Sequence, residues 1–325
     1  YLFCIPIVSH YMKIQKIKDK SKIITVPPSS RVPIETSPNM FTHHCIMLCV
    51  GKRGQGKSVY ISNYLRMLKE ERKADRILVI SPTFLSNAAL IESLDIEPED
   101  CFDPEDKKSL QHVLGIIDDE RDDYVADLER IKRYKRFKKL VDGTMIPILE
   151  LDPYDFLEFT DELGQMIEPK LKYGHRPNIH LWVDDCQSTK LFRSQKFANL
   201  CIRHRHVGGI KKVKDGHKDQ IGAIGCSVYI AIQNLKAQQG GCPRAVRNNA
   251  TQLIIVGKSK DEQELKEIYS SVGGEIEYEH FMKAYEYATA EPHNSLVIDL
   301  HPKSCHPSQF RKNMNEFIIL NKEKK

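Results

Sequence analysis

Hydrophobic and polar residues along the chain follow two patterns, and each pattern predicts one kind of element. Short, nearly continuous apolar runs predict buried strands, while apolar residues spaced three and four apart predict helices that pack on one face. The runs predicted as strands are 45–50, 75–81, 179–185, 226–234, 249–256 and 295–300. The segments predicted as helices are 59–69, 107–140, 191–201, 261–271 and 278–287. Strands that alternate with helices predict an α/β fold with a mostly parallel sheet flanked by helices.

Segments without these patterns suggest the domain boundaries. Residues 1–40 contain a Lys-rich and then a Pro/Ser-rich stretch, which predicts a poorly ordered N-terminal arm. The first eleven residues lack a basic region and a clear cleavage site, so they make a poor signal peptide, and Met12 is a candidate start. We expect one core domain at 41–305, interrupted by a charged helical insertion at 84–175, and a C-terminal tail at 306–325.

One loop stands out between the first predicted strand and the first predicted helix. Residues 51–58 read Gly-Lys-Arg-Gly-Gln-Gly-Lys-Ser, which fits the P-loop pattern. In such a loop, glycines let the backbone approach a phosphate, and backbone N–H groups and the helix N-terminus bind its charge. Lys57 would reach the β- and γ-phosphates of a nucleotide, and Ser58 would bind Mg²⁺. The predicted nucleotide-binding residues are Gly51, Gly54, Gln55, Gly56, Lys57, Ser58 and Val59.

Two acidic residues end the predicted strand at 179–185. An apolar strand that ends in carboxylates is what a P-loop enzyme needs opposite its phosphate loop. Asp184 would hold Mg²⁺, directly or through water. Asp185 could orient or deprotonate an attacking water. The predicted strand at 226–234 ends in amides, Gln233 among them. If that strand lies between the other two, its polar end can hydrogen-bond the γ-phosphate or the water.

Basic residues concentrate in two segments, 130–139 and 203–218. The first is the end of a predicted helix, and the acidic stretch at 150–168 offsets its charge. A solvated helix whose charged faces pair with each other explains this segment. A contact surface for nucleic acid or for a neighbouring subunit explains it too.

Composition limits the class of protein but does not identify its binding partner. The chain has 325 residues, 41% of them hydrophobic and 29% charged, and no apolar run reaches membrane-spanning length. The net charge of +5 permits a nucleic-acid partner but does not require one. Nine cysteines without a C-x-x-C pair indicate reduced thiols rather than a disulfide framework. A zinc site from Cys201, His204 and His206 would lack an evident fourth ligand.

Several segments together carry a family likeness. The chain resembles the genome-packaging ATPases of nucleocytoplasmic large DNA viruses, the poxvirus-type packaging ATPases within the FtsK/HerA superfamily of P-loop NTPases. The matching segments are GKRGQGKS at 51–58, VISPT at 79–83, LWVDDCQ at 181–187, RHRHVGG at 203–209, AIQNL at 231–235 and VRNNATQLIIV at 246–256. They extend over about 50 to 260, which is most of the predicted core.

The resemblance implies a RecA-like P-loop fold and an ATPase that pulls double-stranded DNA into a preformed capsid. It implies ATP and Mg²⁺ as cofactors, with Lys57 and Ser58 as phosphate and metal residues. It makes Asp184 the metal carboxylate, Asp185 the base and Gln233 the polar sensor. Many relatives carry glutamate at the base position, where this chain has the shorter Asp185.

The resemblance also implies partners and a place of action. Relatives work as homo-oligomeric rings, and a capsid portal or other capsid and membrane proteins would receive the DNA. The site of action would be the virion assembly site, a cytoplasmic virus factory, with transient association with the virion. In a ring, a neighbour commonly supplies an arginine to the γ-phosphate. The candidates are Arg203, Arg205, Arg244 and Arg247, and we favour Arg205 and Arg247 because they lie in matching segments.

Other functions remain open at this stage. A replicative or recombination-type helicase is the nearest alternative, because the same core can move single strands. A P-loop nucleotide kinase fits less well, given the chain's size and the amide-ended strand. A structural or regulatory P-loop protein fits less well, because Lys57, Ser58 and both aspartates are present.

Overall fold

The computed structural model describes residue 34 and residues 36–83, 88–143, 152–214, 217–235, 241–259, 261–272 and 276–320. The chain divides into two compact units, Tyr1–Val32 and Pro33–Lys325, and the described residues all belong to the second. The predictions for most of the N-terminal arm, for 144–151 of the insertion and for 321–325 therefore lie outside the described residues.

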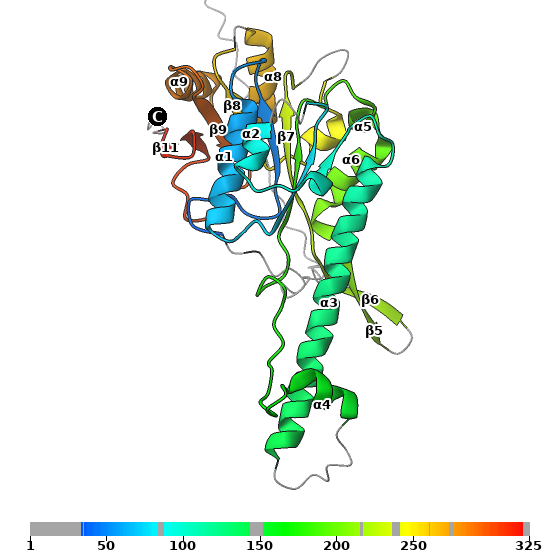
Figure 1. Ribbon diagram of the computed structural model, residues 1–325. Helices are drawn as coiled ribbons and strands as arrows, with labels where there is room; N and C mark the ends of the chain where they lie inside the picture. Colours follow the sequence, from blue (N-terminus) through cyan, green and yellow to red (C-terminus); the bar gives the residue numbers. More distant parts are fainter. Residues whose placement is uncertain are drawn as a thin grey trace, which may run out of the picture. The chain divides into compact units, whose positions relative to one another are not determined.

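Among the described residues, a nine-stranded sheet forms the centre of the second unit (Figure 1). The central strands pair in parallel, whereas β8, β9, β10 and β11 pair antiparallel at one edge. This arrangement confirms the predicted α/β fold with a mostly parallel sheet. In order across the sheet, the strands are β11 (Glu316–Ile318), β10 (Phe310–Lys312), β9 (Ser295–Asp299), β8 (Gln252–Val256), β1 (Ile46–Val50), β7 (Ser227–Ile232), β4 (Ile179–Val183), β2 (Arg76–Ile80) and β3 (Cys101–Phe102).

Helices cover both faces of this sheet, which explains why its central strands are buried and mostly apolar on both sides. Along β1, Leu48 points into one hydrophobic cluster, and Met47 and Cys49 point into the other. The described helices are α1 (Lys57–Glu70), α2 (Ala88–Glu92), α3 (Ser109–Asp142), α4 (Pro153–Phe159), α5 (Lys190–Arg193), α6 (Gln195–Arg203), α7 (Arg244–Arg247), α8 (Glu262–Val272) and α9 (Tyr278–Ala288). Helix α1 packs in one cluster, and α3, α5, α6, α8 and α9 pack in the other.

The predicted charged helix at 107–140 is α3, whose 34 residues span about 51 Å. Its first turns pack on the sheet through Leu110, Val113 and Ile117. Its last turns instead form a separate small cluster, in which Tyr134 and Phe137 meet Phe159 of α4. We call this second part the arm; it comprises residues 128–143 and 152–168 (Figure 1).

Ion pairs between α3 and α4 hold the arm together. Arg130 lies 2.7 Å from Glu158, and Arg133 pairs with both Asp155 and Glu158. Two arginines of the basic segment at 130–139 are therefore paired with the acidic stretch that follows it. The salt-bridged interpretation holds for this side of the helix.

The C-terminal boundary differs from the prediction. Residues 306–320, which we expected to form a tail, contribute β10 and β11 to the sheet. Arg311 on β10 is buried, donates to the carbonyl of Asn39 and lies 3.8 Å from Asp299. The two strands are only three residues long and mix charged with apolar side chains, so their sequence pattern is too short to indicate a strand.

The described residues also form a two-stranded antiparallel sheet, β5 (Gly209–Lys214) with β6 (His217–Ala223). It contains four of the six Lys and Arg residues of the second basic segment, including Lys211, whose side chain is exposed. No described helix is long and apolar enough to cross a membrane.

Candidate active site

The P-loop joins the carboxyl end of β1 to the first turn of α1. Its backbone conformation requires glycine at specific positions. Gly56 has φ +101, in the left-handed region, immediately before α1 begins at Lys57. A Cβ on Gly51 would lie 2.8 Å from the carbonyl oxygen of Val256 in the neighbouring strand β8. The glycines predicted from the motif thus have a structural reason in this chain.

The N-terminus of α1 is open to an anion. Among the described residues, no side chain caps this helix end, and its first turn contains no acidic residue. The first N–H groups of a helix have no partner within the helix, and they carry its partial positive charge. Lys57 begins the helix, and its amine donates to the carbonyl of Lys52 at 3.1 Å, which folds it across the loop. These donors fit a phosphate group.

Strand β4 brings the first acidic residue to the loop. Because β1, β7 and β4 are parallel neighbours, the residues that follow their carboxyl ends share one edge of the sheet. The Ser58 hydroxyl donates to Asp184, with distances of 2.9 and 3.1 Å to its two carboxylate oxygens. Asp184 is only 4% exposed, and its backbone N–H donates to the carbonyl of Ile80. A hydroxyl beside a carboxylate is the oxygen donor set that suits Mg²⁺.

The second acidic residue meets the amide predicted on the middle strand. Strand β7 lies between β1 and β4, so the condition set by the sequence for Gln233 is met. Its side-chain Nε2 donates to Asp185 Oδ1 at 3.2 Å. Asp185 has φ +51, an uncommon conformation for a residue other than glycine, and such residues cluster at functional sites. Asp185 and Gln233 are both accessible to solvent, unlike Asp184.

Gln187 is a residue of this site that sequence reasoning missed. Its Oε1 accepts from the backbone N–H of Gln233 at 2.7 Å, and its Nε2 donates to the carbonyl of Asn234 at 2.9 Å. The amide therefore ties the loop after β4 to the end of β7. Its place two residues after the acidic pair, within the LWVDDCQ segment, was the available signal.

The P-loop also contacts two loops from the other side of β1. Gln55 receives a hydrogen bond from the Lys52 N–H and donates to the carbonyl of Lys258 at 3.3 Å. His293, with φ +66, places its Nδ1 3.2 Å from the carbonyl of Gln55. The side chain of Gln55 thus forms hydrogen bonds within the protein. Val59, one residue after Ser58, is half exposed. No sequence signal pointed to His293.

Neither favoured arginine contacts the P-loop in the described part of the chain. Arg205 is exposed in the turn His204–His206, next to the amino end of β7, where the Cys226 N–H donates to the carbonyl of His204. Arg247 ends α7, and its Nε and Nη1 are buried without a hydrogen-bond partner among the described residues. The structure does not bring either arginine to the P-loop of its own chain.

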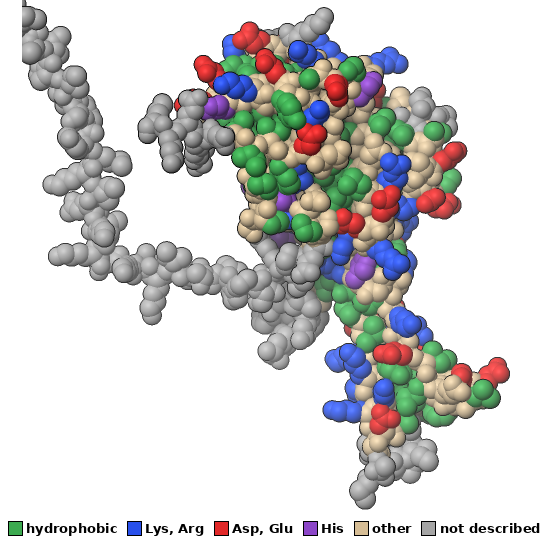
Figure 2. Space-filling view, turned by 90° about the vertical axis from the view of Figure 1, so that its left-hand side faces the viewer, with side chains coloured by type: hydrophobic (Ala, Val, Ile, Leu, Met, Phe, Trp, Pro, Cys, Tyr) green, Lys and Arg blue, Asp and Glu red, His purple; other side chains and the backbone are tan. Residues whose placement is uncertain are grey.

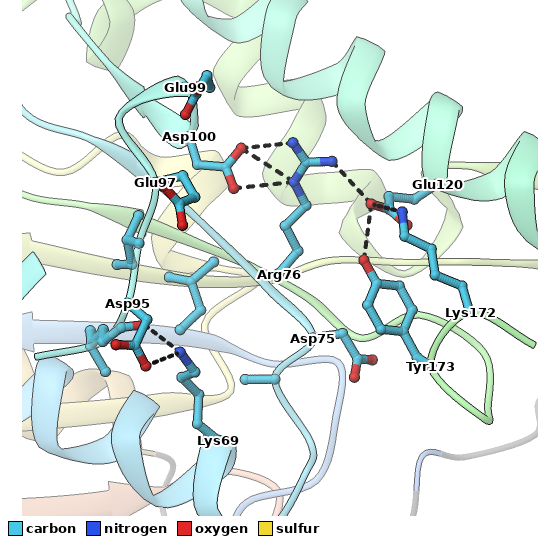
Figure 3. A pocket seen from close by; sticks show the side chains of 14 residues that line it. Lys69, Asp75, Arg76, Asp95, Glu97, Glu99, Asp100, Glu120, Lys172 and Tyr173 are labelled. Atoms are coloured by element: carbon cyan, nitrogen blue, oxygen red, sulfur yellow. Dashed lines mark hydrogen bonds and ion pairs between the residues drawn. The ribbon is translucent and has the colours of Figure 1, made fainter. Parts of the chain in front are cut away.

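Charged residues also line a cavity of about 540 Å³ at the opposite, amino end of β2 (Figure 3). Here Arg76 binds Asp100 at 2.8 Å and Glu120 at 3.0 Å, and Lys172 also binds Glu120 at 3.0 Å. The labelled side chains of Figure 3 mostly point at each other across the cavity. Its buried charges are paired inside the protein, so it is not the nucleotide site.

The cysteines and histidines do not make a metal centre in the described part of the chain. No group of three or more His, Cys, Asp or Glu side chains there could hold a metal ion, which leaves the zinc hypothesis for Cys201, His204 and His206 without support. Burial, followed by the charges of Asp184 and Asp185, raises the pKa of the Cys186 thiol. This thiol stays protonated beside the two carboxylates.

No protein-family model and no curated protein matches the chain. Its fold is similar to that of the genome-packaging NTPase B204 from Sulfolobus turreted icosahedral virus 2. In complex with AMPPCP, that structure has a TM-score of 0.42 and 11% identity, over 83% of this chain and 96% of that one. With ATP-gammaS, the values are 0.41 and 13%, over 86% and 98%. The DNA-packaging ATPase B204 from Sulfolobus turreted icosahedral virus gives 0.40 and 12%, over 83% and 97%. Similarities this low transfer no residue role.

Proposed function

We propose that this chain binds ATP with Mg²⁺ and hydrolyses it. One observation carries this proposal: the open N-terminus of α1 with Lys57 lies beside two carboxylates that have different partners. Asp184 is buried and accepts a hydrogen bond from the Ser58 hydroxyl. Asp185 is accessible to solvent and accepts a hydrogen bond from Gln233. Two carboxylates in different surroundings can take different roles in one reaction.

Each residue has a task in this reaction. The loop N–H groups and the Lys57 amine bind the β- and γ-phosphates. Ser58 and Asp184 would hold Mg²⁺, which would supply positive charge to the phosphate oxygens. Asp185 accepts a proton from water as the water oxygen attacks the γ-phosphorus and the bond to the ADP oxygen breaks. Gln233 donates to one oxygen of Asp185, which leaves its own amide oxygen to orient that water.

The test is Mg²⁺-dependent ATP turnover, measured together with nucleotide affinity. Lys57→Ala should abolish most binding or turnover, because the amine at the phosphates is lost. Lys52→Ala is the matched control, since the Lys57 amine binds the Lys52 backbone carbonyl, which this change keeps. Equal loss in the two variants, or turnover that persists without Mg²⁺, would contradict the assignment.

A further part of the proposal is the identity of the polymer that this ATPase moves. We infer that it is double-stranded DNA, packaged into a preformed viral capsid at the site of virion assembly, as the resemblance to the poxvirus-type packaging ATPases suggests. The basic hairpin of β5 and β6 supports a nucleic-acid contact, because a two-stranded ribbon can enter the major groove. A helicase acting on single strands is the alternative.

Stimulation of ATP turnover by different nucleic acids separates these two functions. A packaging motor should respond to duplex DNA more than to single strands. Its affinity should fall steeply as salt rises from low to physiological concentration, because bound counterions are released. It should show little sequence preference, because a pump contacts the backbone. Stronger stimulation by single strands would favour the helicase.

Assembly into a homo-oligomeric ring with shared sites completes the proposal, with Arg205 or Arg247 acting on a neighbour's γ-phosphate. Arg205 is exposed, whereas Arg247 would have to turn its buried guanidinium outward. Mixing Arg205→Ala with Lys57→Ala should restore part of the activity, because one interface then combines an intact arginine with an intact loop. The same mixture made with Arg247→Ala tests the second candidate. If neither mixture regains turnover, these arginines do not act across the interface.

A further inference from the structure

Exposed apolar side chains concentrate on the arm. Of the twelve large hydrophobic residues that are exposed among the described residues, eight lie between 128 and 167. The most exposed are Tyr154 at 77%, Leu157 at 76% and Leu163 at 83%. Tyr154 and Leu157 are three apart on α4, on the side away from the cluster that Phe159 forms with α3. A patch of this kind on a surface indicates a contact with another molecule.

The other side of the arm is cationic. Lys132, Lys135, Arg136 and Lys139 are three, four and seven apart, so they lie on one side of α3. This cationic stripe is opposite the side that holds Arg130 and Arg133 against α4. All four stripe residues are exposed, and none forms an ion pair with a described residue, in contrast to Arg130 and Arg133.

Acidic residues accompany the apolar side instead. The turn after α4 folds back on it, with the Ile167 N–H donating to the carbonyl of Phe159. Within this turn, Glu162 and Glu168 are exposed on either side of Leu163 and are not ion-paired in the described structure. Figure 2 shows Lys and Arg gathered along one edge of the arm, and Asp, Glu and hydrophobic side chains along the other.

We propose that the arm joins neighbouring copies of this chain head to tail. The cationic stripe on α3 of one copy would bind the acidic and apolar side of α4 on the next. Two complementary surfaces on opposite sides of one element produce a heterologous contact, which closes into a ring when the rotation per subunit allows. This inference rests on the ring assembly proposed above and assigns a surface to it.

Two other partners explain less of the arm. DNA would bind the cationic stripe but would leave the apolar patch on α4 without a role. An anionic membrane attracts helices that carry their cations around an apolar face. Here the side chains around the apolar patch include Glu162 and Glu168, which the lipid charge would repel. Both partners are separate outcomes of the experiment below.

The experiment exchanges the charges of the two surfaces in the full-length chain. Lys132→Glu/Arg136→Glu reverses the stripe, and Glu162→Lys/Glu168→Lys reverses the acidic side. Self-association is measured by sedimentation at physiological salt, with and without a slowly hydrolysed ATP analogue and Mg²⁺. Each double variant should associate at least tenfold more weakly. Mixing the two variants, or combining all four changes in one chain, should restore association, because each contact again joins opposite charges.

The controls separate this surface from the nucleotide site and from general effects of charge. Lys266→Glu/Lys283→Glu makes the same charge change on α8 and α9 and should leave association unchanged. Binding of the ATP analogue should stay at the wild-type level in every variant, and a wild-type chain that does not bind it would contradict the proposed function rather than the arm contact. Leu163→Ser should weaken association without any change in charge.

Three results would overturn the arm contact. One is a wild-type chain that stays monomeric at all concentrations. Another is a variant with all four substitutions that associates as weakly as the two double variants. The third is a stripe variant that associates normally but loses affinity for duplex DNA or for anionic vesicles, which would assign the stripe to that partner.

Discussion

The two ends of the parallel strands carry similar residue types but use them differently. At the amino end of β2, Arg76, Asp100, Glu120 and Lys172 are bound to each other around the cavity. At the carboxyl end, the start of α1 is uncapped in the described structure, and Lys57 contacts only a backbone carbonyl. The amino end has a cavity of about 540 Å³ lined with these charges. The carboxyl end has donors that still lack a strong partner, and this is why we propose it as the nucleotide site.

This difference shows that paired charges stabilise a fold, whereas donors without strong partners are available to a ligand. A buried carboxylate with a good cation needs nothing further from a ligand. A helix N-terminus, a lysine and two carboxylates in different surroundings can still exchange their present partners for a nucleotide and a metal ion. The contrast therefore predicts that changes at the amino end affect stability, and that changes at the carboxyl end affect chemistry.

The strongest test of the contrast is Arg76→Met. It removes the positive charge that pairs with Asp100 and with Glu120, which is 2% exposed. The free energy of unfolding should therefore fall by about 3 kcal/mol. Nucleotide affinity should not change once the folded fraction is taken into account. Lys69→Met is the control, because its ion-pair partner Asp95 is 86% exposed and the pair should contribute less than about 1 kcal/mol. Chemical denaturation measures both. Equal effects of the two changes would show that the buried pairs are not structural.

The opposite behaviour is expected for Asp185→Asn. Without a carboxylate to accept the proton, turnover should fall by about 10²-fold or more, while ATP affinity and the free energy of unfolding stay near the wild-type values. Asp95→Asn is the matched control on an exposed carboxylate far from the P-loop. Steady-state turnover and nucleotide titration check this prediction. Wild-type turnover in Asp185→Asn would remove the base assignment.

The amino end should also be the more sensitive to acid. His180 on β4 is buried, and its Nε2 lies 2.8 Å from the carbonyl of Lys73, so this nitrogen carries the proton. Its Nδ1 then accepts from the Tyr229 hydroxyl at 2.9 Å. Burial lowers the pKa of His180 from 6.5 to about 4, although the hydrogen bond to the Lys73 carbonyl opposes this shift.

Because the unfolded chain takes up this proton first, stability is complete above pH 6.5 and falls as the pH decreases toward 4. The loss should be at most about 1.4 kcal/mol per pH unit for this group. His180→Gln should reduce the slope of unfolding free energy against pH, whereas His301→Gln, at an exposed position, should not. An unchanged slope in His180→Gln would show that His180 does not contribute.

The smallest effect is expected at Gln187, which touches neither phosphate nor water in the proposed reaction. Gln187→Ala removes the link between the loop after β4 and the end of β7, so Gln233 should hold Asp185 less well. Turnover should decrease roughly three- to tenfold, equivalent to about 1 kcal/mol, with little change in ATP affinity. Gln187→Glu retains the acceptor for the Gln233 N–H and should recover part of the rate. No recovery would indicate a structural role only.

Contacts between residues that are close in the sequence could be predicted. Contacts between residues far apart in the sequence could be predicted less well. The P-loop and the acidic strand end are local patterns, and parallel pairing brings their ends to one edge of the sheet. The position of β7 between β1 and β4 could only be assumed from the sequence, because strand order depends on pairings such as that of β1 with β7, which lie more than a hundred residues apart. The pairs of Arg130 and Arg133 with α4 were indicated only by the acidic stretch that follows the basic segment, and His293 had no local signal at all.

Helix α3 connects regions that would otherwise be mechanically independent. It starts just after Glu105, which pairs with Lys190 in the segment that follows Asp184 and Asp185, and its far end forms the arm. An α-helix of this length bends little, so it acts as a lever with its pivot on the sheet. A tilt of about 10° in its first turns would displace the far end by about 9 Å over its length of about 51 Å. In the ring proposed above, a small rearrangement around the P-loop on ATP hydrolysis would reach a neighbouring subunit as a stroke several times larger.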